Sequence, residues 1–239
     1  MTWSIIARDK ATGRTGIIVA TKFFAVGSRV PHLKTGVGAV ASQAFVNPFY
    51  GPQGLALLQA GAAPEDVVKL LTKADEGRDH RQLHVMDRDG RFAAYTGAAC
   101  VDWCGHCVHD HDGFSVAGNM LAGPEVIAET ARIYDVSMDL PFARRLIAAM
   151  KAGEAAGGDK RGKQSAALLI HDDQDYSLLD LRVDDHADPL AELGRLEGIA
   201  RERWVHFRRF MPSRENSSGL VDRATLDAQI ANSIAEGYE

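Results

Sequence analysis

The chain has 239 residues and a net charge of −5, with 46% hydrophobic and 25% charged residues. This composition is ordinary for a globular protein, and the length allows one large domain or one domain with an appendage. The small negative charge gives no electrostatic reason to expect nucleic acid or an anionic membrane as a partner. Since we find no apolar run of about 18 residues and no signal-peptide pattern, we expect a cytoplasmic protein.

The N-terminal half alternates predicted strands with a pair of predicted helices. Its apolar patterns predict strands at 3–8, 16–21 and 36–44, helices at about 52–60 and 65–74, and strands in LHVMD and RFAAYTG. The polar turn DKATGRT makes the first two strands a hairpin, and Asp89-Gly90 between the last two is a strong hairpin signal.

The second half repeats this order. Its patterns predict a strand in FSVAGNM, helices at about 124–134 and 139–151, and strands at 164–170 and 177–183. Because the helices come in pairs between blocks of strands, the sequence predicts an α+β fold with antiparallel hairpins rather than βαβ alternation.

The last 52 residues, 188–239, differ from the rest. Asp188-Pro189 is a good helix start, and the helix is expected to run to about Phe207. MPSRENSSG is typical of a linker, and a short amphipathic helix follows it. We therefore predict a main domain at 1–187 and a helical extension at 188–239, which packs on the body or on a partner chain.

Thr2 follows the initiator methionine at the start of the first predicted strand. A threonine hydroxyl is a weak nucleophile, so another group must take its proton. If Met1 is removed, the α-amine of Thr2 has a reference pKa of about 8 and can be that base. The simpler alternative is that the strand begins early, since many proteins start with Met-Thr.

Longer segments carry a resemblance to a known superfamily. The first 28 residues are similar to the start of the N-terminal nucleophile (Ntn) hydrolases, which have the proteasome-subunit-like fold. Over about residues 2–196 the chain resembles an uncharacterised bacterial family of that superfamily, in the segments ATKFFAVGSRVP, GVGAVASQAFVNPFYGPQGL, AGNMLAGPEV, GGDKRGKQSAALL and DLRVDDHADPLAEL. The resemblance implies a four-layer αββα sandwich.

The resemblance implies catalytic roles for Thr2, Lys22, Lys34 and Ser165 and substrate or oxyanion contacts for Gln43, Asn47 and Asn119. Thr2 matches the nucleophile. Lys22 ends the second strand, where proteasome-like members hold an acidic residue, and Lys34 is the other candidate for an activating lysine. Ser165 matches a supporting serine near the terminal amine. The turn at 42–43 matches the source of an oxyanion-stabilising backbone N–H.

Each of these assignments has a simpler alternative. Lys22 and Lys34 would then be solvated surface lysines. Gln43 and Asn47 would satisfy turn backbone, and Ser165 would be an ordinary strand serine. If the resemblance holds, the nucleophile, Lys22, Gln43 and Ser165 converge on one pocket.

The segment CVDWCGHCVHDHDG holds the three cysteines of the chain, too few for a disulfide framework. Cys104 and Cys107 have the spacing of zinc ligands, and Cys100 and His106 are further candidates. The segment has no second Cys-x-x-Cys, so it contains half a motif. We expect no metal and no cofactor, and a metal-dependent site at 100–111 is the alternative.

The sequence thus predicts an amidohydrolase that cleaves an amide or related C–N bond in a small molecule through Thr2. The alternative is a catalytically inactive protein of the same fold that binds a small ligand or a partner. We expect a homodimer or a higher homo-oligomer, with no nucleic acid or membrane partner.

Overall fold

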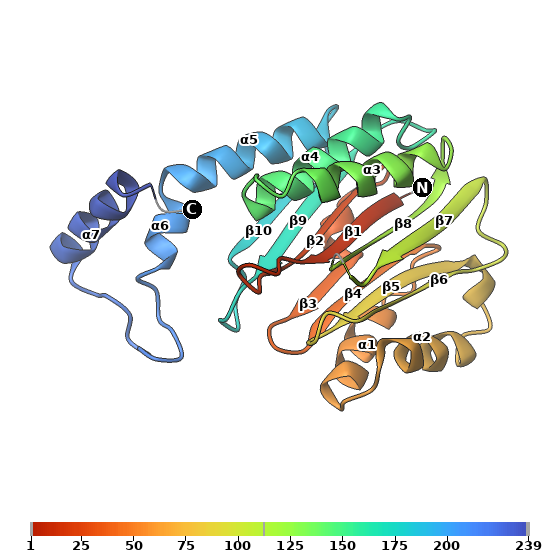
Figure 1. The fold of residues 1–239 in the computed structure, drawn as a ribbon, viewed down its shortest axis with the longest axis horizontal. Helices are drawn as coiled ribbons and strands as arrows, with labels where there is room; N and C mark the ends of the chain where they lie inside the picture. Colours follow the sequence, from red (N-terminus) through yellow and green to blue (C-terminus); the bar gives the residue numbers. More distant parts are fainter. Residues whose placement is uncertain (1, 112, 238–239) are drawn as a thin grey trace. The chain divides into compact units, whose positions relative to one another are not determined.

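Residues 2–111 and 113–237 are described by a computed structural model, and they form ten strands and seven α-helices (Figure 1). The strands are β1 (Thr2–Arg8), β2 (Thr15–Thr21), β3 (Pro31–Lys34), β4 (Gly38–Ala44), β5 (Arg81–Asp87), β6 (Phe92–Thr96), β7 (Trp103–His109), β8 (Phe114–Leu121), β9 (Ser165–His171) and β10 (Leu179–Val183). The helices are α1 (Tyr50–Gln59), α2 (Pro64–Lys73), α3 (Glu125–Val136), α4 (Phe142–Ala155), α5 (Pro189–Glu202), α6 (Trp204–Arg208) and α7 (Arg223–Ala235).

The strands form two antiparallel sheets. The six-stranded sheet has the order β10-β9-β2-β1-β8-β7, and the four-stranded sheet has the order β3-β4-β5-β6. The predicted hairpins are confirmed, because β1 pairs with β2 and β9 pairs with β10, both antiparallel. The α+β class and its antiparallel sheets therefore follow from the sequence pattern.

Helices cover the outer face of each sheet in the unit formed by residues 1–193 (Figure 1). α1 and α2 pack on the four-stranded sheet, and α3 and α4 pack on the six-stranded sheet. Side chains of β1 alternate between these layers. Trp3 faces α4, since a Cβ at Gly153 would lie 3.1 Å from its Nε1, whereas Ser4 faces the other sheet and bonds Gln43.

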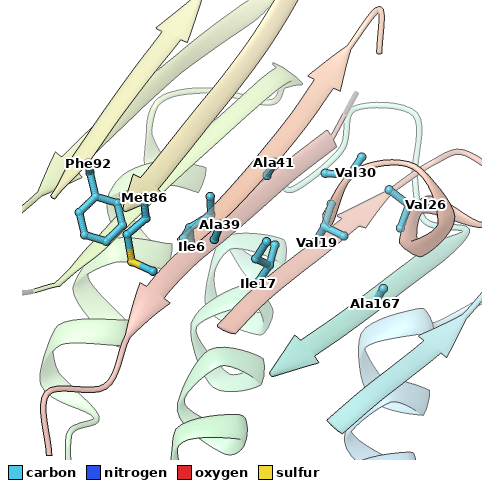
Figure 2. Packing of buried hydrophobic residues seen from close by; sticks show 10 residues of the cluster. All are labelled: Ile6, Ile17, Val19, Val26, Val30, Ala39, Ala41, Met86, Phe92 and Ala167. Atoms are coloured by element: carbon cyan, nitrogen blue, oxygen red, sulfur yellow. The ribbon is translucent and has the colours of Figure 1, made fainter. Parts of the chain in front are cut away.

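An apolar cluster fills part of the space between the sheets (Figure 2). Its buried members are Ile6, Ile17, Val19, Val26, Val30, Ala39, Ala41, Met86, Phe92 and Ala167. They come from both sheets and from the connection between β2 and β3. Burial of these side chains is the main favourable contribution that holds the two sheets together.

The structure corrects three expectations. β3 was not predicted, because its four residues are too few to show alternation. β7 lies in the Cys/His segment, where no strand was predicted. The helix that begins at Pro189 ends at Glu202 instead of about Phe207, and Arg203 adopts a non-helical conformation before α6.

Residues 194–239 form a second compact unit, described up to residue 237. Within it, Asp222 caps α7 by accepting the Thr225 N–H at 2.9 Å, and Arg203 pairs with Asp227 at 2.7 Å. The boundary at 188 and the role of this extension stay predictions. None of the helices in the described part of the chain has both the length and the apolar character that a bilayer crossing requires.

Candidate functional site

Strand ends from both sheets meet around Thr2. The register places Thr2 of β1 opposite Thr21 at the end of β2 and opposite Asn119 of β8. In the facing sheet, Gln43 of β4 lies opposite Gln82 of β5. The connections that leave these strand ends enclose a cavity of about 550 Å³, and Thr2 is part of its wall.

Thr2 is held through its side chain and through its carbonyl group. It is 8% exposed, and its Oγ1 lies 3.0 Å from Oγ1 of Thr21. Its carbonyl oxygen accepts hydrogen bonds from Gln43 Nε2 at 3.3 Å and from Asn119 Nδ2 at 3.2 Å. Chain termini are usually poorly ordered unless they are tied down, and these bonds fix Thr2 at the cavity wall.

Gln82 orients the two amides that hold Thr2. Its Oε1 accepts hydrogen bonds from Gln43 Nε2 at 2.9 Å and from Asn119 Nδ2 at 3.1 Å. Its own Nε2 donates to the carbonyl of Gly118 at 2.8 Å. Because Gln82 is fully buried, this network is shielded from water and sets the direction of both amides.

His84 extends the network between the sheets. Ser4 donates to Gln43 Oε1 at 2.7 Å, so its hydroxyl oxygen is left to accept from His84 Nε2 at 2.9 Å. His84 Nδ1 then accepts from the Ser115 hydroxyl at 2.8 Å. Burial, together with repulsion from His106, lowers the pKa of His84 to about 3, so its ring is neutral.

The walls of the cavity are largely apolar. Side chains from three connections supply them: Phe23, Val26 and Val30 after β2, Phe45 and Val46 after β4, and Val101 after β6. Phe23 is 64% exposed and Phe45 is 75% exposed. Exposed aromatic side chains beside a cavity are typical of a binding site for a ligand with an apolar part.

Unusual backbone conformations gather at this cavity. Four non-glycine residues in the described chain have positive φ, and all lie in its lining or next to it in sequence: Ala25 (52°), Ala44 (69°), Asp102 (56°) and Met120 (55°). Such conformations are unfavourable for residues with a Cβ, and they concentrate at functional sites. The residues with positive φ therefore lie at the same cavity as the side chains around Thr2.

Lys22 lies one position beyond the residue that contacts Thr2. Side chains alternate along β2, so Thr21 points toward Thr2 and Lys22 points away. The Lys22 Nζ donates to the Lys163 carbonyl at 3.1 Å, and Lys22 does not line the cavity. The sequence analysis did not identify Thr21. The alternation of side chains along the predicted β1–β2 hairpin could have identified it.

Ser165 lies opposite Thr21 on β9, two strands away from Thr2. Its hydroxyl donates to the Phe23 carbonyl at 2.5 Å and accepts the Val26 N–H at 3.1 Å. Ser165 therefore fixes the cavity wall and is not in the lining. The convergence expected of four residues is seen for Thr2 and Gln43, and not for Lys22 and Ser165.

Lys34 and Asn47 are also outside the cavity. Lys34 pairs with Gly38 at the opposite end of β4 from Gln43, and its Nζ donates to Gln59 Oε1 at 2.8 Å. Asn47 uses its side chain in a turn, where its Oδ1 accepts the Phe49 N–H at 3.0 Å. Lys34 and Asn47, for which the resemblance implied an activating lysine and an oxyanion or substrate contact, therefore do not line the cavity.

The Cys/His segment does not gather its side chains into a metal site. In β7, His106 and Cys107 both line a separate hollow beside α3, and the His106 ring bonds Thr96 of β6. Cys104 bonds the Cys100 carbonyl instead. Within the described residues no group of three metal-ligating side chains forms. Burial raises the pKa of the Cys100, Cys104 and Cys107 thiols.

The family model and one solved structure agree on one family. Residues 2–193 match the family model "Family of unknown function (DUF1028)". The crystal structure of protein SPO2555 from Silicibacter pomeroyi, described as DUF1028, is 34% identical with a TM-score of 0.83, covering 92% of this chain and 99% of that one. Anbu (ancestral beta-subunit) from Yersinia bercovieri is 13% identical with a TM-score of 0.44, covering 83% and 95%.

No curated protein matches the chain. The family match extends over the whole unit that contains the cavity and Thr2. The chain therefore belongs to the DUF1028 family, whose function is unknown.

Proposed function

We propose that the protein is an N-terminal nucleophile hydrolase that cleaves an amide or related C–N bond in a small molecule, with Thr2 as the nucleophile. One observation carries the proposal: the second residue of the chain lies in the wall of the 550 Å³ cavity, and its hydroxyl is 3.0 Å from that of Thr21. Once Met1 is removed, the same residue supplies the base. Met1 lies outside the described residues, so its removal stays a prediction.

The reaction needs two steps at Thr2. Oγ1 attacks the carbonyl carbon of the amide while its proton passes to the free α-amine. The tetrahedral intermediate then releases the amine product, which takes that proton, and an ester to Thr2 remains. Water, deprotonated by the α-amine, attacks the ester carbonyl, the C–O bond to Thr2 breaks, and Oγ1 takes the proton back from the α-ammonium group. The products are a carboxylic acid and the regenerated threonine.

The surrounding side chains would position Thr2 rather than contact the substrate. Gln43 and Asn119 donate to the Thr2 carbonyl, so these side-chain N–H groups are already used. Thr21 Oγ1 fixes the direction of the nucleophilic hydroxyl. Such positioning lowers the barrier because little ordering is left to the moment of reaction.

The layer arrangement supports the same proposal. Two facing antiparallel sheets with a helix pair on each outer face have the αββα order that the Ntn resemblance implies. The sequence segments and this order of layers support the proposal that the 1–187 domain belongs to the Ntn superfamily.

A second candidate is a catalytically inactive protein that uses the same cavity to bind a ligand. It is favoured by one observation: among the described residues that line the cavity there is no lysine to assist Thr2. In this case Thr2 would contact the ligand without attacking it.

Reaction with an aliphatic β-lactone separates the two candidates. The Thr2 hydroxyl opens the lactone ring to an ester, so the adduct can be located by peptide mass spectrometry. We expect the purified protein to lack Met1 and to be modified at Thr2. Thr2→Ser should still react, and Thr2→Ala should not.

A matched control inserts one glycine between Met1 and Thr2. The hydroxyl is then retained, but the α-amine becomes a peptide nitrogen that cannot take a proton. Equal rates of modification in this variant and in the processed protein would overturn the proposed mechanism. Loss of modification in the glycine variant supports it.

A further inference from the structure

The charges that line the Thr2 cavity have one sign. Its charged side chains are those of Arg29 and Arg161, and no aspartate or glutamate lines it within the part of the chain that the structure describes. The protein as a whole carries a net charge of −5, so this basic lining is local. A low-dielectric cavity with charges of one sign favours ligands of the opposite sign.

The two arginines differ in how far their charge is already compensated. Arg161 pairs with Asp159 at 3.3 Å, and the Asp159 side chain is 2% exposed. Arg29 is exposed, and among the described residues its guanidinium makes one long hydrogen bond, 3.5 Å, to the Ser28 carbonyl. Arg29 is therefore the cation available to a ligand.

Arg29 lies on a wall that is held in place. The connection between β2 and β3 is fixed by the two bonds of Ser165 and by the Ala25 N–H, which donates to the Asp184 carbonyl at 2.9 Å. Gly27 packs so closely on β9 that a Cβ there would lie 2.6 Å from Ala167 Cβ. A fixed wall presents its cation at a defined place, which lowers the ordering cost of binding.

We infer that the ligand of this cavity is an amphipathic carboxylate: an apolar body that packs on Phe23 and Phe45, with its carboxylate at Arg29. Guanidinium groups match carboxylates with charge-assisted hydrogen bonds, and the exposed aromatic rings account for the apolar part. This inference rests on the proposed function insofar as the ligand is a substrate, which would then be an amide that carries a separate carboxylate.

Binding can be tested without turnover in the Thr2→Ala variant. The probes are 4-phenylbutyrate, its neutral amide 4-phenylbutyramide and the cation 4-phenylbutylamine, measured by isothermal titration calorimetry at low salt. We expect the carboxylate to bind best and the amine worst. Arg29→Gln should weaken the carboxylate about tenfold and leave the neutral amide unchanged. Phe45→Ser should weaken both the carboxylate and the neutral amide.

Arg88→Gln is the matched control, because it removes one exposed arginine at the β5–β6 turn, away from the cavity lining. Equal binding of the three probes, or equal effects of Arg29→Gln and Arg88→Gln, would overturn the inference. If lactone modification at Thr2 fails while the carboxylate preference persists, the hydrolase proposal alone is wrong. If modification succeeds without that preference, the inference alone is wrong.

Discussion

The layer between the two sheets has an apolar half and a polar half. The apolar half is the cluster of Figure 2, which includes Ile17, Ala39 and Met86. The polar half consists of side chains that are each 2% exposed or less: Ser4, Gln43, Gln82, His84, Ser115 and Asn119. Both halves are buried, so burial alone does not explain why their chemistry differs.

The contribution of apolar burial to stability explains why one half is apolar, but stability does not explain why the other half is polar. Buried apolar side chains contribute directly to folding, whereas buried polar groups gain little net energy and are costly when unpaired. The polar network ends at the carbonyl of Thr2, the residue we propose as nucleophile. We therefore expect substitutions in the apolar half to change stability alone. Substitutions in the polar half should change both stability and the geometry of Thr2.

The largest loss of stability is expected from Ile17→Ala in the apolar half. Ile17 is fully buried, and its truncation should lower the free energy of unfolding by about 3 kcal/mol. Urea unfolding measures this change, with Ile17→Val as a milder control of about 1 kcal/mol. The rate of lactone modification per folded molecule should stay unchanged. A slower reaction in the folded fraction would contradict the division between the halves.

Gln82→Met should lower the free energy of unfolding by about 2 kcal/mol, because two buried amides lose their shared acceptor while the side-chain volume is kept. Unlike Ile17→Ala, it should also slow lactone modification per folded molecule about tenfold, since Gln43 and Asn119 lose their orientation. Urea unfolding and mass spectrometry give both values for the same sample. An unchanged rate would mean that the network does not position Thr2.

The two halves also differ in how far the sequence predicts them. Apolar periodicity is sufficient to predict the β1–β2 and β9–β10 hairpins and the paired helices, with a period of two residues in strands and about 3.6 in helices. The polar half depends on contacts between distant positions, such as Ser4 with His84, which are 80 residues apart. No local pattern indicates such a contact, so Ser4 and His84 look like ordinary strand residues.

The candidate site, too, could be predicted only in part from the sequence. The resemblance implied substrate or oxyanion contacts for Gln43 and Asn119, and in the structure both line the cavity and donate to the Thr2 carbonyl. The resemblance pointed to Lys22, whereas the residue that contacts Thr2 is its neighbour Thr21. A resemblance in sequence does not show which residue of a strand faces inward. Arg29 and Arg161 come from separate connections, and only the fold brings them to one cavity.

The polar half should make stability depend on pH through His84. Its pKa is about 3 in the folded protein and 6.5 in the reference state, so the unfolded chain binds an extra proton between these values. Stability due to His84 is therefore complete above pH 6.5 and is lost as pH falls, by about 1.4 kcal/mol per pH unit. His84→Gln should show a flatter profile in urea unfolding from pH 6.5 to 4.5. His80→Gln serves as the control, because His80 is exposed and lies outside the buried network.

The smallest change in stability is expected from Thr21→Val, although this residue is nearest to the proposed chemistry. Valine has nearly the same shape as threonine and suits a strand, so losing one hydrogen bond to Thr2 should cost about 1 kcal/mol or less. The Thr2 hydroxyl would lose its fixed direction, and we expect slower lactone modification with Met1 removal unchanged. Thr21→Ser keeps the hydroxyl and should react nearly as the wild type. If Thr21→Val reacts as fast as Thr21→Ser, Thr21 does not orient the nucleophile, and the amide clamp on the Thr2 carbonyl is sufficient to position it.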